Sequence, residues 1–295
     1  MRNHTVIYMI LAILGAGLCL APGKAEAGVQ EGLLPGVVSL DYCADQYVLQ
    51  LADRPQIIAV SQEAGQAHSF YRARAAGLAR FHGSIEEMLA LAPDLAVRSY
   101  VSAPRMQGMS EKVGVRLLTT RYGSSLETVV HNIATVADAL GQQQKAAAQI
   151  RAYKADMKRL QALPGIPLRA AYITPSGFTA GSGTFVDDII RLAGLGSYAR
   201  DKGYSGWLPL SLEDLVQDPP EVFVTSFYDT DLQTRSGWSL SRHARLGAMI
   251  DVVPTLDLPG RYMACDGLFM TRAADHIRAA AARSGLVHTV SGAAR

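Results

Sequence analysis

The sequence predicts an α/β protein made of two related lobes, and three observations lead to this prediction. Residues 84–97 (SIEEMLALAPDLAV) align without a gap with residues 211–224 (SLEDLVQDPPEVFV), 127 positions later. Short apolar runs alternate with helical patterns along the chain, which is typical of parallel α/β packing. A long helical pattern separates the two copies. The separation is too long for a solenoid repeat, so the duplication indicates two similar lobes with a ligand cleft between them.

Each copy of the repeat predicts a helix, a turn and a strand. A serine precedes an apolar-periodic run that has acids in its first turn, as at a capped helix start. Proline ends the helix, and a short apolar run at 95–97 or 222–224 predicts a buried strand. Glu86 and Glu213 occupy the same position of the two copies.

Residues 1–27 are expected to be a signal peptide. A basic or polar start precedes an almost wholly apolar stretch at 6–20, and an Ala-Glu-Ala cleavage site follows at 25–27. The apolar stretch is short for a membrane span. Cys19 lacks the small residue directly before it that lipoprotein processing needs. We therefore expect an exported, periplasmic protein.

The first lobe is expected to span residues 28–123. Its short apolar runs alternate with amphipathic stretches, as in a sheet with helices packed on it. In chain order, we expect a strand at 36–40, a helix at 42–51, a strand at 57–60, a polar connection at 61–80, the first repeat unit and a strand at 115–118.

Residues 124–164 are expected to form a long helix that joins the lobes. Serine at 124 with glutamate at 127 is a capping-box pattern, and the helical periodicity continues to about residue 163. Gly141 is the position at which this helix could break or bend. If unbroken, it would be about 50 Å long.

The second lobe is expected to span residues 165–295. It repeats the alternation of the first lobe, with glycine-rich turns between its elements. In chain order, we expect a strand at 170–174, a turn at 177–183, a helix at 185–193, a loop at 196–209, the second repeat unit, a helix at 241–250, a strand at 252–256 and a closing helix at 268–284.

These segments, in this order, resemble the periplasmic solute-binding proteins of ABC importers for vitamin B12 and ferric siderophores. The resemblance is carried by residues 37–61 (VVSLDYCADQYVLQLADRPQIIAVS), the two repeat units, the central helical pattern and residues 206–215 (GWLPLSLEDL). It implies two Rossmann-like α/β lobes joined by a rigid helix, with the ligand held between them. It also implies docking on the transmembrane subunits of an ABC permease.

The resemblance assigns a docking role to Glu86 and Glu213, because an acidic residue on each lobe of such proteins is held by arginines of the permease. Two equivalent acids on two equivalent lobes would suit a two-fold symmetric partner. The alternative is that both glutamates only stabilise the N-termini of their helices.

Candidate ligand contacts follow from the rule that ligands bind at the carboxyl ends of the strands in open α/β sheets. Trp207 stands where cobalamin-binding relatives place a cleft tryptophan, and its indole could stack on a flat ligand; the alternative is a packing residue. Tyr71 lies where heme-binding relatives place an axial tyrosine. The full set is Tyr42, Cys43, Tyr71, Arg98, Tyr100, Phe178, Tyr204, Trp207, Tyr228, Arg261 and Asp266.

Cys43 and Cys265 lie in different lobes, each after a predicted strand and before a predicted helix. Three interpretations stay open. In an oxidising compartment the pair is a candidate disulfide across the lobes. Two thiolates could instead bind a soft metal or metal complex. The thiols could also be buried apolar groups.

The function classes can be narrowed from composition and motifs. The net charge is only +2 and no basic stripe is present, so nucleic-acid binding is not expected. The sequence also lacks a hydrolase nucleophile elbow, a phosphate-binding loop and a zinc-binding signature, so no enzyme is expected. The histidines lack metal-ligand spacing. The leading hypothesis is a monomeric binding protein, without a cofactor of its own, that captures a corrinoid or ferric-siderophore chelate for import. The alternatives are a heme-binding protein of the same fold and a ligand-sensing adaptor.

Overall fold

Two separate parallel β-sheets form the framework of the computed structural model, which describes residues 34–99, 114–123, 125–226, 248–249 and 251–286. The first sheet has the order β3-β2-β1-β4-β5 and lies wholly within the predicted first lobe. Its strands are β1 (Val37–Ser39), β2 (Ile57–Ser61), β3 (Ala79–Phe81), β4 (Leu95–Arg98) and β5 (Arg116–Thr119).

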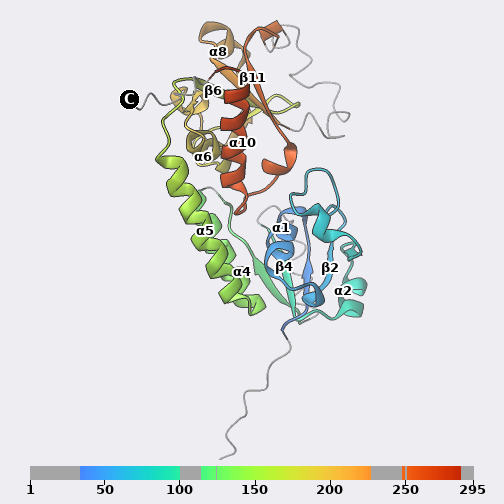
Figure 1. Cartoon of the computed structure of the whole chain (residues 1–295). Helices are drawn as coiled ribbons and strands as arrows, with labels where there is room; N and C mark the ends of the chain where they lie inside the picture. The colour runs from blue at the N-terminus through green and yellow to red at the C-terminus, as the bar shows by residue number, and fades with distance from the viewer. Residues whose placement is uncertain (1–33, 100–113, 124, 227–247, 250, 287–295) are drawn as a thin grey trace, which may run out of the picture. The chain divides into compact units, whose positions relative to one another are not determined.

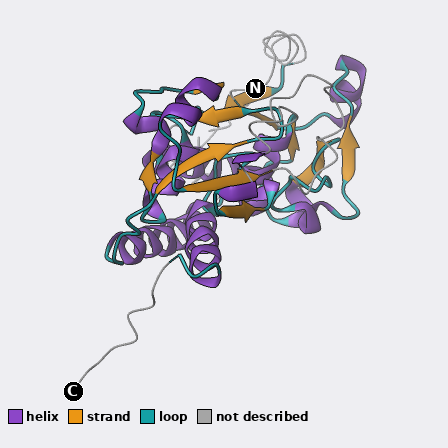
Figure 2. Ribbon diagram, turned by 90° about the horizontal axis from the view of Figure 1, so that it is seen from above, coloured by secondary structure: helices purple, strands orange, loops and turns teal. Residues whose placement is uncertain are grey.

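The second sheet has the order β11-β10-β6-β8, and a two-stranded antiparallel ribbon of β7 and β9 accompanies it. Figure 2 shows helices on both sides of the strands. The strands are β6 (Arg169–Ile173), β7 (Phe178–Ala180), β8 (Gly196–Ser197), β9 (Trp207–Pro209), β10 (Val222–Ser226) and β11 (Thr255–Leu258).

The helices begin where short polar side chains can accept from free backbone N–H groups. Asp41 caps the first one, and serine or threonine caps most of the others. The helices are α1 (Tyr42–Leu51), α2 (Ile85–Leu91), α4 (Leu126–Leu140), α5 (Gln143–Gln161), α6 (Phe185–Leu192), α7 (Tyr198–Asp201), α8 (Leu212–Gln217) and α10 (Met270–Arg283).

The predicted duplication is confirmed. Both copies of the repeat fold as a short helix followed by a strand, α2–β4 and α8–β10, and Figure 1 labels these helices. The strand is central in each sheet: β4 lies between β1 and β5, and β10 lies between β6 and β11. The pairing with the neighbouring strand also begins at the same repeat position in both sheets: Leu95 pairs with Val37, and its equivalent Val222 pairs with Ala170. The two lobes are therefore built on one plan.

The interlobe helical segment is broken at Gly141, the position at which the sequence allowed it to break or bend. Gly141 ends α4 in the left-handed conformation, with φ 70°, and α5 begins two residues later. Glycine adopts this conformation without the steric penalty of a side chain, so it is well suited to stop a helix. The connection between the lobes is therefore a pair of helices that pack against each other.

The second helix of this pair is tied to both lobes. Near its start, the Lys145 ammonium donates to the backbone oxygen of Leu51 at 2.8 Å and lies 3.2 Å from the Asp53 carboxylate. Near its end, the Arg159 guanidinium makes two hydrogen bonds to Asp275 of α10, at 3.0 and 2.6 Å. These contacts attach α5 to α1 on one side and to α10 on the other.

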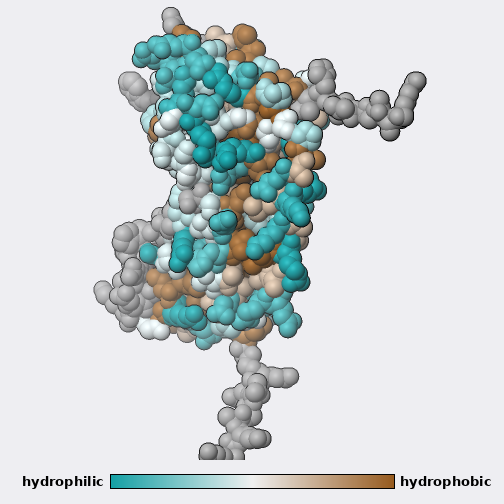
Figure 3. Space-filling view, turned by 90° about the vertical axis from the view of Figure 1, so that its left-hand side faces the viewer, coloured by the Kyte–Doolittle hydropathy of each residue, from teal (hydrophilic) through white to brown (hydrophobic). Residues whose placement is uncertain are grey.

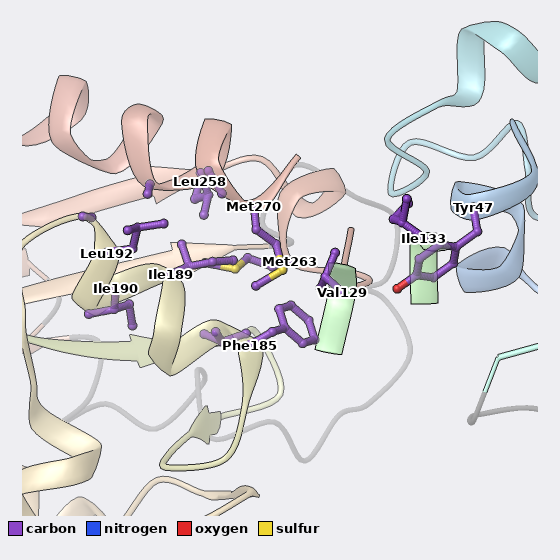
Figure 4. Close-up of a cluster of buried hydrophobic side chains, with 14 of the residues drawn as sticks. Tyr47, Val129, Ile133, Phe185, Ile189, Ile190, Leu192, Leu258, Met263 and Met270 are labelled. Carbon is purple, nitrogen blue, oxygen red and sulfur yellow. The ribbon is translucent and has the colours of Figure 1, made fainter. Parts of the chain in front are cut away.

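One hydrophobic cluster continues from the first sheet through α4 into the second sheet, so the lobes share a core. The close-up in Figure 4 shows part of it, with α4 side chains next to those of α6 and α10. Fully buried aliphatic side chains of this kind supply most of the favourable free energy of folding. The members labelled there are Tyr47, Val129, Ile133, Phe185, Ile189, Ile190, Leu192, Leu258, Met263 and Met270.

Several expected boundaries need correction. The polar connection at 61–80 runs into β3, and the turn and loop around 177–209 contain β7, α7 and β9. The strand expected at 252–256 lies at Thr255–Leu258. The signal peptide and most of the helix expected at 241–250 lie outside the described residues. In the part of the chain that is described, no helix combines the length and the apolar character that a membrane span requires.

Candidate ligand-binding and docking site

A hollow of about 370 Å³ opens at the carboxyl ends of β1, β2 and β3, the edge at which open α/β sheets bind ligands. Segments expected to contact ligand, after the first strand and in the connection that follows the second, both contribute to it. Its lining mixes polar and apolar residues and includes two acids and a histidine. The lining residues are Leu40, Asp41, Ser61, Gln62, Glu63, Phe81, His82 and Gly83.

Asp41 organises the backbone at this edge. One carboxylate oxygen accepts from the backbone N–H groups of Cys43 and Ala44, at 3.1 and 2.9 Å, and so caps α1. The other accepts from the backbone N–H of Ser99 at 2.7 Å. Tyr42 follows directly, with its ring edge-on to His68 at 5.4 Å. Burial, together with the nearby Glu63 and Asp41 carboxylates, raises the pKa of Tyr42, so its phenol stays neutral.

Trp207 presents a half-exposed indole in the second lobe. Its ring packs edge-to-face on Tyr172 and Phe185, with centroids 6.1 and 6.3 Å away, while 41% of the residue remains exposed. The indole N–H donates to the hydroxyl of Tyr122, which follows β5 of the first lobe, at 3.0 Å. Phe178, also 41% exposed, lies on the same face of the β7–β9 ribbon, because Ala180 is paired with Trp207 and Phe178 with Pro209. Two exposed aromatic side chains thus share one small surface.

The structure joins Cys43 and Cys265 in a disulfide, with their Cα atoms 5.4 Å apart. The bridge links the first turn of α1 to the segment just before α10. Both residues are buried, 1% and 2% exposed, in an aromatic cluster that includes Phe70 and Phe269. Neither sulfur therefore offers open surface to a ligand, and the bridge ties the two lobes covalently.

Asp266, which follows Cys265 in the sequence, adds hydrogen bonds to the covalent link between the two lobes. Its carboxylate accepts from the Tyr47 hydroxyl of α1 at 2.6 Å, and the side-chain amide of Asn132 donates to the same hydroxyl at 3.2 Å. Asn132 also donates to the backbone oxygen of Arg121 at 2.9 Å. Burial raises the pKa of Asp266 to about 6. Asp266 is thus a buried junction residue.

Tyr47, Asn132 and Tyr122 were not identified from the sequence, although all three bridge the lobes. The available signal was weak: Tyr47 and Asn132 are polar residues on the otherwise apolar faces of two helices. Buried polar side chains are nearly always hydrogen-bonded, so such positions call for partners. Nothing in the sequence shows that the partner is Asp266.

Gly123 leaves room for this network, and its replacement by alanine should disrupt it. An added Cβ would lie 1.9 Å from a carboxylate oxygen of Asp266, closer than any real contact. Since overpacking a buried site costs roughly 1–3 kcal/mol, we expect Gly123→Ala to lower the free energy of unfolding by about 2 kcal/mol in urea titrations. Gly196→Ala is the matched control, because its added Cβ would find its nearest neighbours at 3.5 Å. Equal stability of the two variants would contradict the expectation.

Tyr71 is not among the residues that line the hollow of about 370 Å³. It packs on Phe70 with centroids 5.0 Å apart, and the Arg74 guanidinium lies 5.1 Å from the centre of its ring. It lines a second cavity, of about 230 Å³, together with residues of α5 and α10. Burial raises the pKa of Tyr71, which is the direction opposite to the one that favours a phenolate ligand for ferric iron.

The other candidate residues are dispersed. The Tyr204 hydroxyl donates to the carboxylate of Asp214. The Arg98 guanidinium donates to the Thr119 hydroxyl at 2.8 Å, and Arg261 stacks on the ring of Tyr262, 5.0 Å from its centre. Tyr100 and Tyr228 lie outside the described residues. Among the residues that are described, no group of three or more His, Cys, Asp or Glu side chains could hold a metal ion.

Glu86 and Glu213 lie in the first turns of α2 and α8, and both are exposed. The serine before each helix caps it in the same way: the Ser84 hydroxyl accepts from the backbone of Glu87 at 3.0 Å, and the Ser211 hydroxyl accepts from Asp214 at 3.1 Å. The two glutamates therefore extend from equivalent places on the two lobes.

Two curated proteins are similar in sequence to this chain. Over 187 residues the chain is 24% identical to an uncharacterized ABC transporter substrate-binding lipoprotein, YvrC, of Bacillus subtilis, covering 59% of each chain. Over 195 residues it is 27% identical to a cobalamin-binding protein of Halobacterium salinarum, covering 64% of this chain and 53% of that protein. The chain therefore matches little more than half the length of these relatives.

A solved structure shows the same fold, and a family model matches most of the chain. The periplasmic heme-binding protein HutB of Vibrio cholerae superposes with a TM-score of 0.67 at 20% identity, over 82% of this chain and 97% of that one. The model of the periplasmic binding protein family matches residues 37–236, which include both copies of the repeat. The chain belongs to the periplasmic binding protein family.

Proposed function

We propose that the protein is the periplasmic substrate-binding component of an ABC importer, which captures a corrinoid or ferric-siderophore chelate and delivers it to the membrane permease. The observation that carries the proposal is the exposed indole of Trp207, held by Tyr122, Tyr172 and Phe185 beside a second exposed aromatic, Phe178. Rigid aromatic surface of this kind binds large, partly apolar ligands with little loss of side-chain entropy.

The cobalamin-binding relative and the resemblance at residues 206–215 support a corrinoid as the first ligand to test. Heme is the alternative, supported by the fold of the heme-binding protein from Vibrio cholerae. Tyr71, the residue that would bind heme iron by resemblance, has a raised pKa and packs against Phe70. This environment counts against Tyr71 as a tyrosinate ligand of heme iron.

Titration calorimetry with cyanocobalamin, ferrichrome and hemin tests the ligand class. We expect cyanocobalamin or ferrichrome to bind and Trp207→Ala to weaken that binding about tenfold, since a good aromatic contact contributes about 1 kcal/mol beyond its buried area. Leu163→Ala, at another exposed apolar residue, is the control and should bind as the wild type does. A tyrosinate–iron absorption band with hemin that disappears in Tyr71→Phe would support heme instead, and failure of all three ligands would refute the proposal.

The role in import requires a separate test, because a ligand-sensing adaptor would bind the same cargo. In host cells carrying Glu86→Gln and Glu213→Gln together, we expect uptake of radiolabelled cyanocobalamin to fall at least tenfold while the purified variant keeps the wild-type ligand affinity. Glu127→Gln, an acid in the first turn of α4 outside the repeat, serves as the control. Unchanged uptake in the double variant would remove the docking assignment, whereas uptake that does not depend on the protein at all would favour the adaptor.

We further propose that the mature protein is an exported monomer. Residues 1–27 would be cleaved as a signal peptide, leaving lobes at 28–123 and 165–295 joined through residues 124–164. The order of the two sheets along the chain and the helix pair between them support this division.

A further inference from the structure

A side-chain hydrogen bond joins the two lobes at an exposed aromatic ring. Tyr122 follows β5 of the first lobe, and its hydroxyl accepts from the indole N–H of Trp207, in β9 of the second lobe, at 3.0 Å. The N–H group lies in the plane of the indole, so the bond engages the edge of the ring and leaves its faces free of the tyrosine. Trp207 remains 41% exposed. The first lobe thus holds a ring that the second lobe presents.

Exposure alone does not single out this ring. The face shown in Figure 3 carries apolar side chains among hydrophilic ones, which is ordinary for a protein surface. Trp207 is distinguished by the partner of its polar group, a residue of the other lobe that lies 85 positions away in the sequence. Water could bond to an exposed indole N–H and leave the ring free to turn, whereas a tyrosine of the protein fixes its orientation.

Tyr122 is mounted on a firmly held segment. The side-chain amide of Asn132 clamps the preceding residue: it accepts from the backbone N–H of Arg121 at 3.0 Å and donates to the backbone oxygen of Arg121 at 2.9 Å. On the other side, Gly123 lies so close to Asp266 of the second lobe that an added Cβ would be 1.9 Å from the carboxylate. The backbone on both sides of Tyr122 is therefore fixed at the junction of the lobes.

Trp207 is also supported within its own lobe. Its strand is paired with β7, and its ring packs on Tyr172 of β6 and Phe185 of α6. Tyr172 is held in turn, because its hydroxyl is hydrogen-bonded at 2.6 Å to the hydroxyl of Ser226, at the end of β10. Side chains whose supports are themselves locked hold a binding geometry precisely. The bond to Tyr122 adds a support from the opposite lobe.

We propose that Tyr122 is a positioning residue for Trp207, so that the ligand-binding orientation of the indole is set only when the two lobes lie in this relative position. The inference rests on the proposed function, in which a large, partly apolar chelate packs on the Trp207 ring. A ligand on the ring and the Tyr122 hydroxyl favour the same orientation of the indole, so each stabilises the other. Tyr122 acts through Trp207 and need not touch the ligand.

Titration calorimetry on the full-length mature protein tests the inference, with whichever of cyanocobalamin, ferrichrome and hemin the wild type binds. Tyr122→Phe keeps the ring and deletes only the hydroxyl. We expect it to raise the Kd roughly two- to tenfold, the factor that corresponds to one ordinary hydrogen bond. In a double-mutant cycle this loss should disappear in the Trp207→Phe background, because phenylalanine has no N–H to donate.

The matched control deletes the same atom elsewhere. Tyr198→Phe removes a buried hydroxyl for which the described residues provide no hydrogen-bond partner, so it should bind the ligand as the wild type does. Urea titrations of all variants establish that they are folded under the conditions of the binding experiment.

Fluorescence without ligand reports the orientation of the ring directly. The chain has two tryptophans, Trp207 and Trp238, so every protein in this experiment carries Trp238→Phe and its emission comes from Trp207. We expect Tyr122→Phe to increase quenching of this emission by acrylamide and to lower its anisotropy, because the released indole turns more freely. Tyr198→Phe should change neither quantity. A role of Tyr122 confined to the packing of the first lobe would not alter the emission of Trp207.

The outcomes separate the inference from the proposed function. If the wild type binds ligand and Tyr122→Phe binds as tightly or more tightly, the positioning role is refuted and the proposed function stands. An equal loss of affinity in the Trp207→Phe background would also refute it, because Tyr122 would then act without the indole. Unchanged quenching and anisotropy would show that the hydroxyl does not hold the ring, with the same consequence. If the wild type binds none of the three ligands, the proposed function fails and the positioning role falls with it.

Discussion

Replacing both Cys43 and Cys265 by alanine is expected to lower the free energy of unfolding by about 5 kcal/mol. The disulfide joins residues separated by 222 positions, so it closes a very long loop in the unfolded chain. In the chain-entropy account, removing such a constraint frees the unfolded state by about 5 kcal/mol. Alanine is preferred to serine because both positions are buried among aromatic rings, where a new hydroxyl would lack a partner. Urea titration of the oxidised mature protein and of the variant measures the difference.

A control distinguishes the bridge from local packing. The wild type titrated in the presence of dithiothreitol should lose its bridge as it unfolds, and its midpoint should approach that of the alanine variant. If the variant remains within about 1 kcal/mol of the oxidised wild type, the bridge does not restrain the unfolded chain as expected. A large loss in the variant with no effect of reductant would instead indicate packing around Phe269.

Asp266→Asn is expected to change how stability depends on pH. Burial raises the pKa of Asp266 to about 6 in the folded protein, against about 3.9 for an unfolded aspartate. The folded state therefore binds this proton more tightly. The resulting stabilisation is fully present below about pH 4 and is lost as the pH rises through about 6, by roughly 3 kcal/mol in total. Asparagine carries no titrating group, so the variant does not undergo this loss.

Urea titrations of the two proteins at several pH values measure the effect. The unfolding free energy of Asp266→Asn minus that of the wild type should increase by roughly 2–3 kcal/mol from pH 4 to pH 7. Asp45, whose pKa burial also raises to about 6, is present in both proteins and cancels in the difference. Parallel pH profiles would contradict the raised pKa. Asp266→Ala, which leaves the Tyr47 hydroxyl without its acceptor, should be less stable than Asp266→Asn throughout.

Much of the fold could be predicted from local sequence. The serine caps at 84 and 211, the acids that follow them and the apolar runs at 95–97 and 222–224 correspond to observed helices and strands. Helix caps and apolar periodicity depend on residues only a few positions apart, so the local sequence is enough to predict them. Strand β3 was missed because Ala79, Arg80 and Phe81 do not form an apolar run, although they pair with β2 in the sheet.

The candidate site was less predictable. Trp207 and Phe178 were singled out from the sequence, and the structure places both on one exposed ribbon face. Their ligand-binding role remains a proposal. Asp266 was assigned to the cleft by its position after a strand, but it is buried against Tyr47. A position at a strand end gives the approximate location of a side chain and not its burial, because burial depends on segments distant in the chain.

The sequence by itself determined the doubled helix–strand unit, the equivalence of Glu86 and Glu213, and the α/β class of both lobes. Tertiary structure alone decided that Cys43 meets Cys265, that Tyr47 and Asn132 meet at the Asp266 carboxylate, and that Tyr122 meets Trp207. The physical reason is range: caps and apolar periodicity act within a few residues, whereas these contacts depend on how elements up to 222 positions apart pack around a shared core.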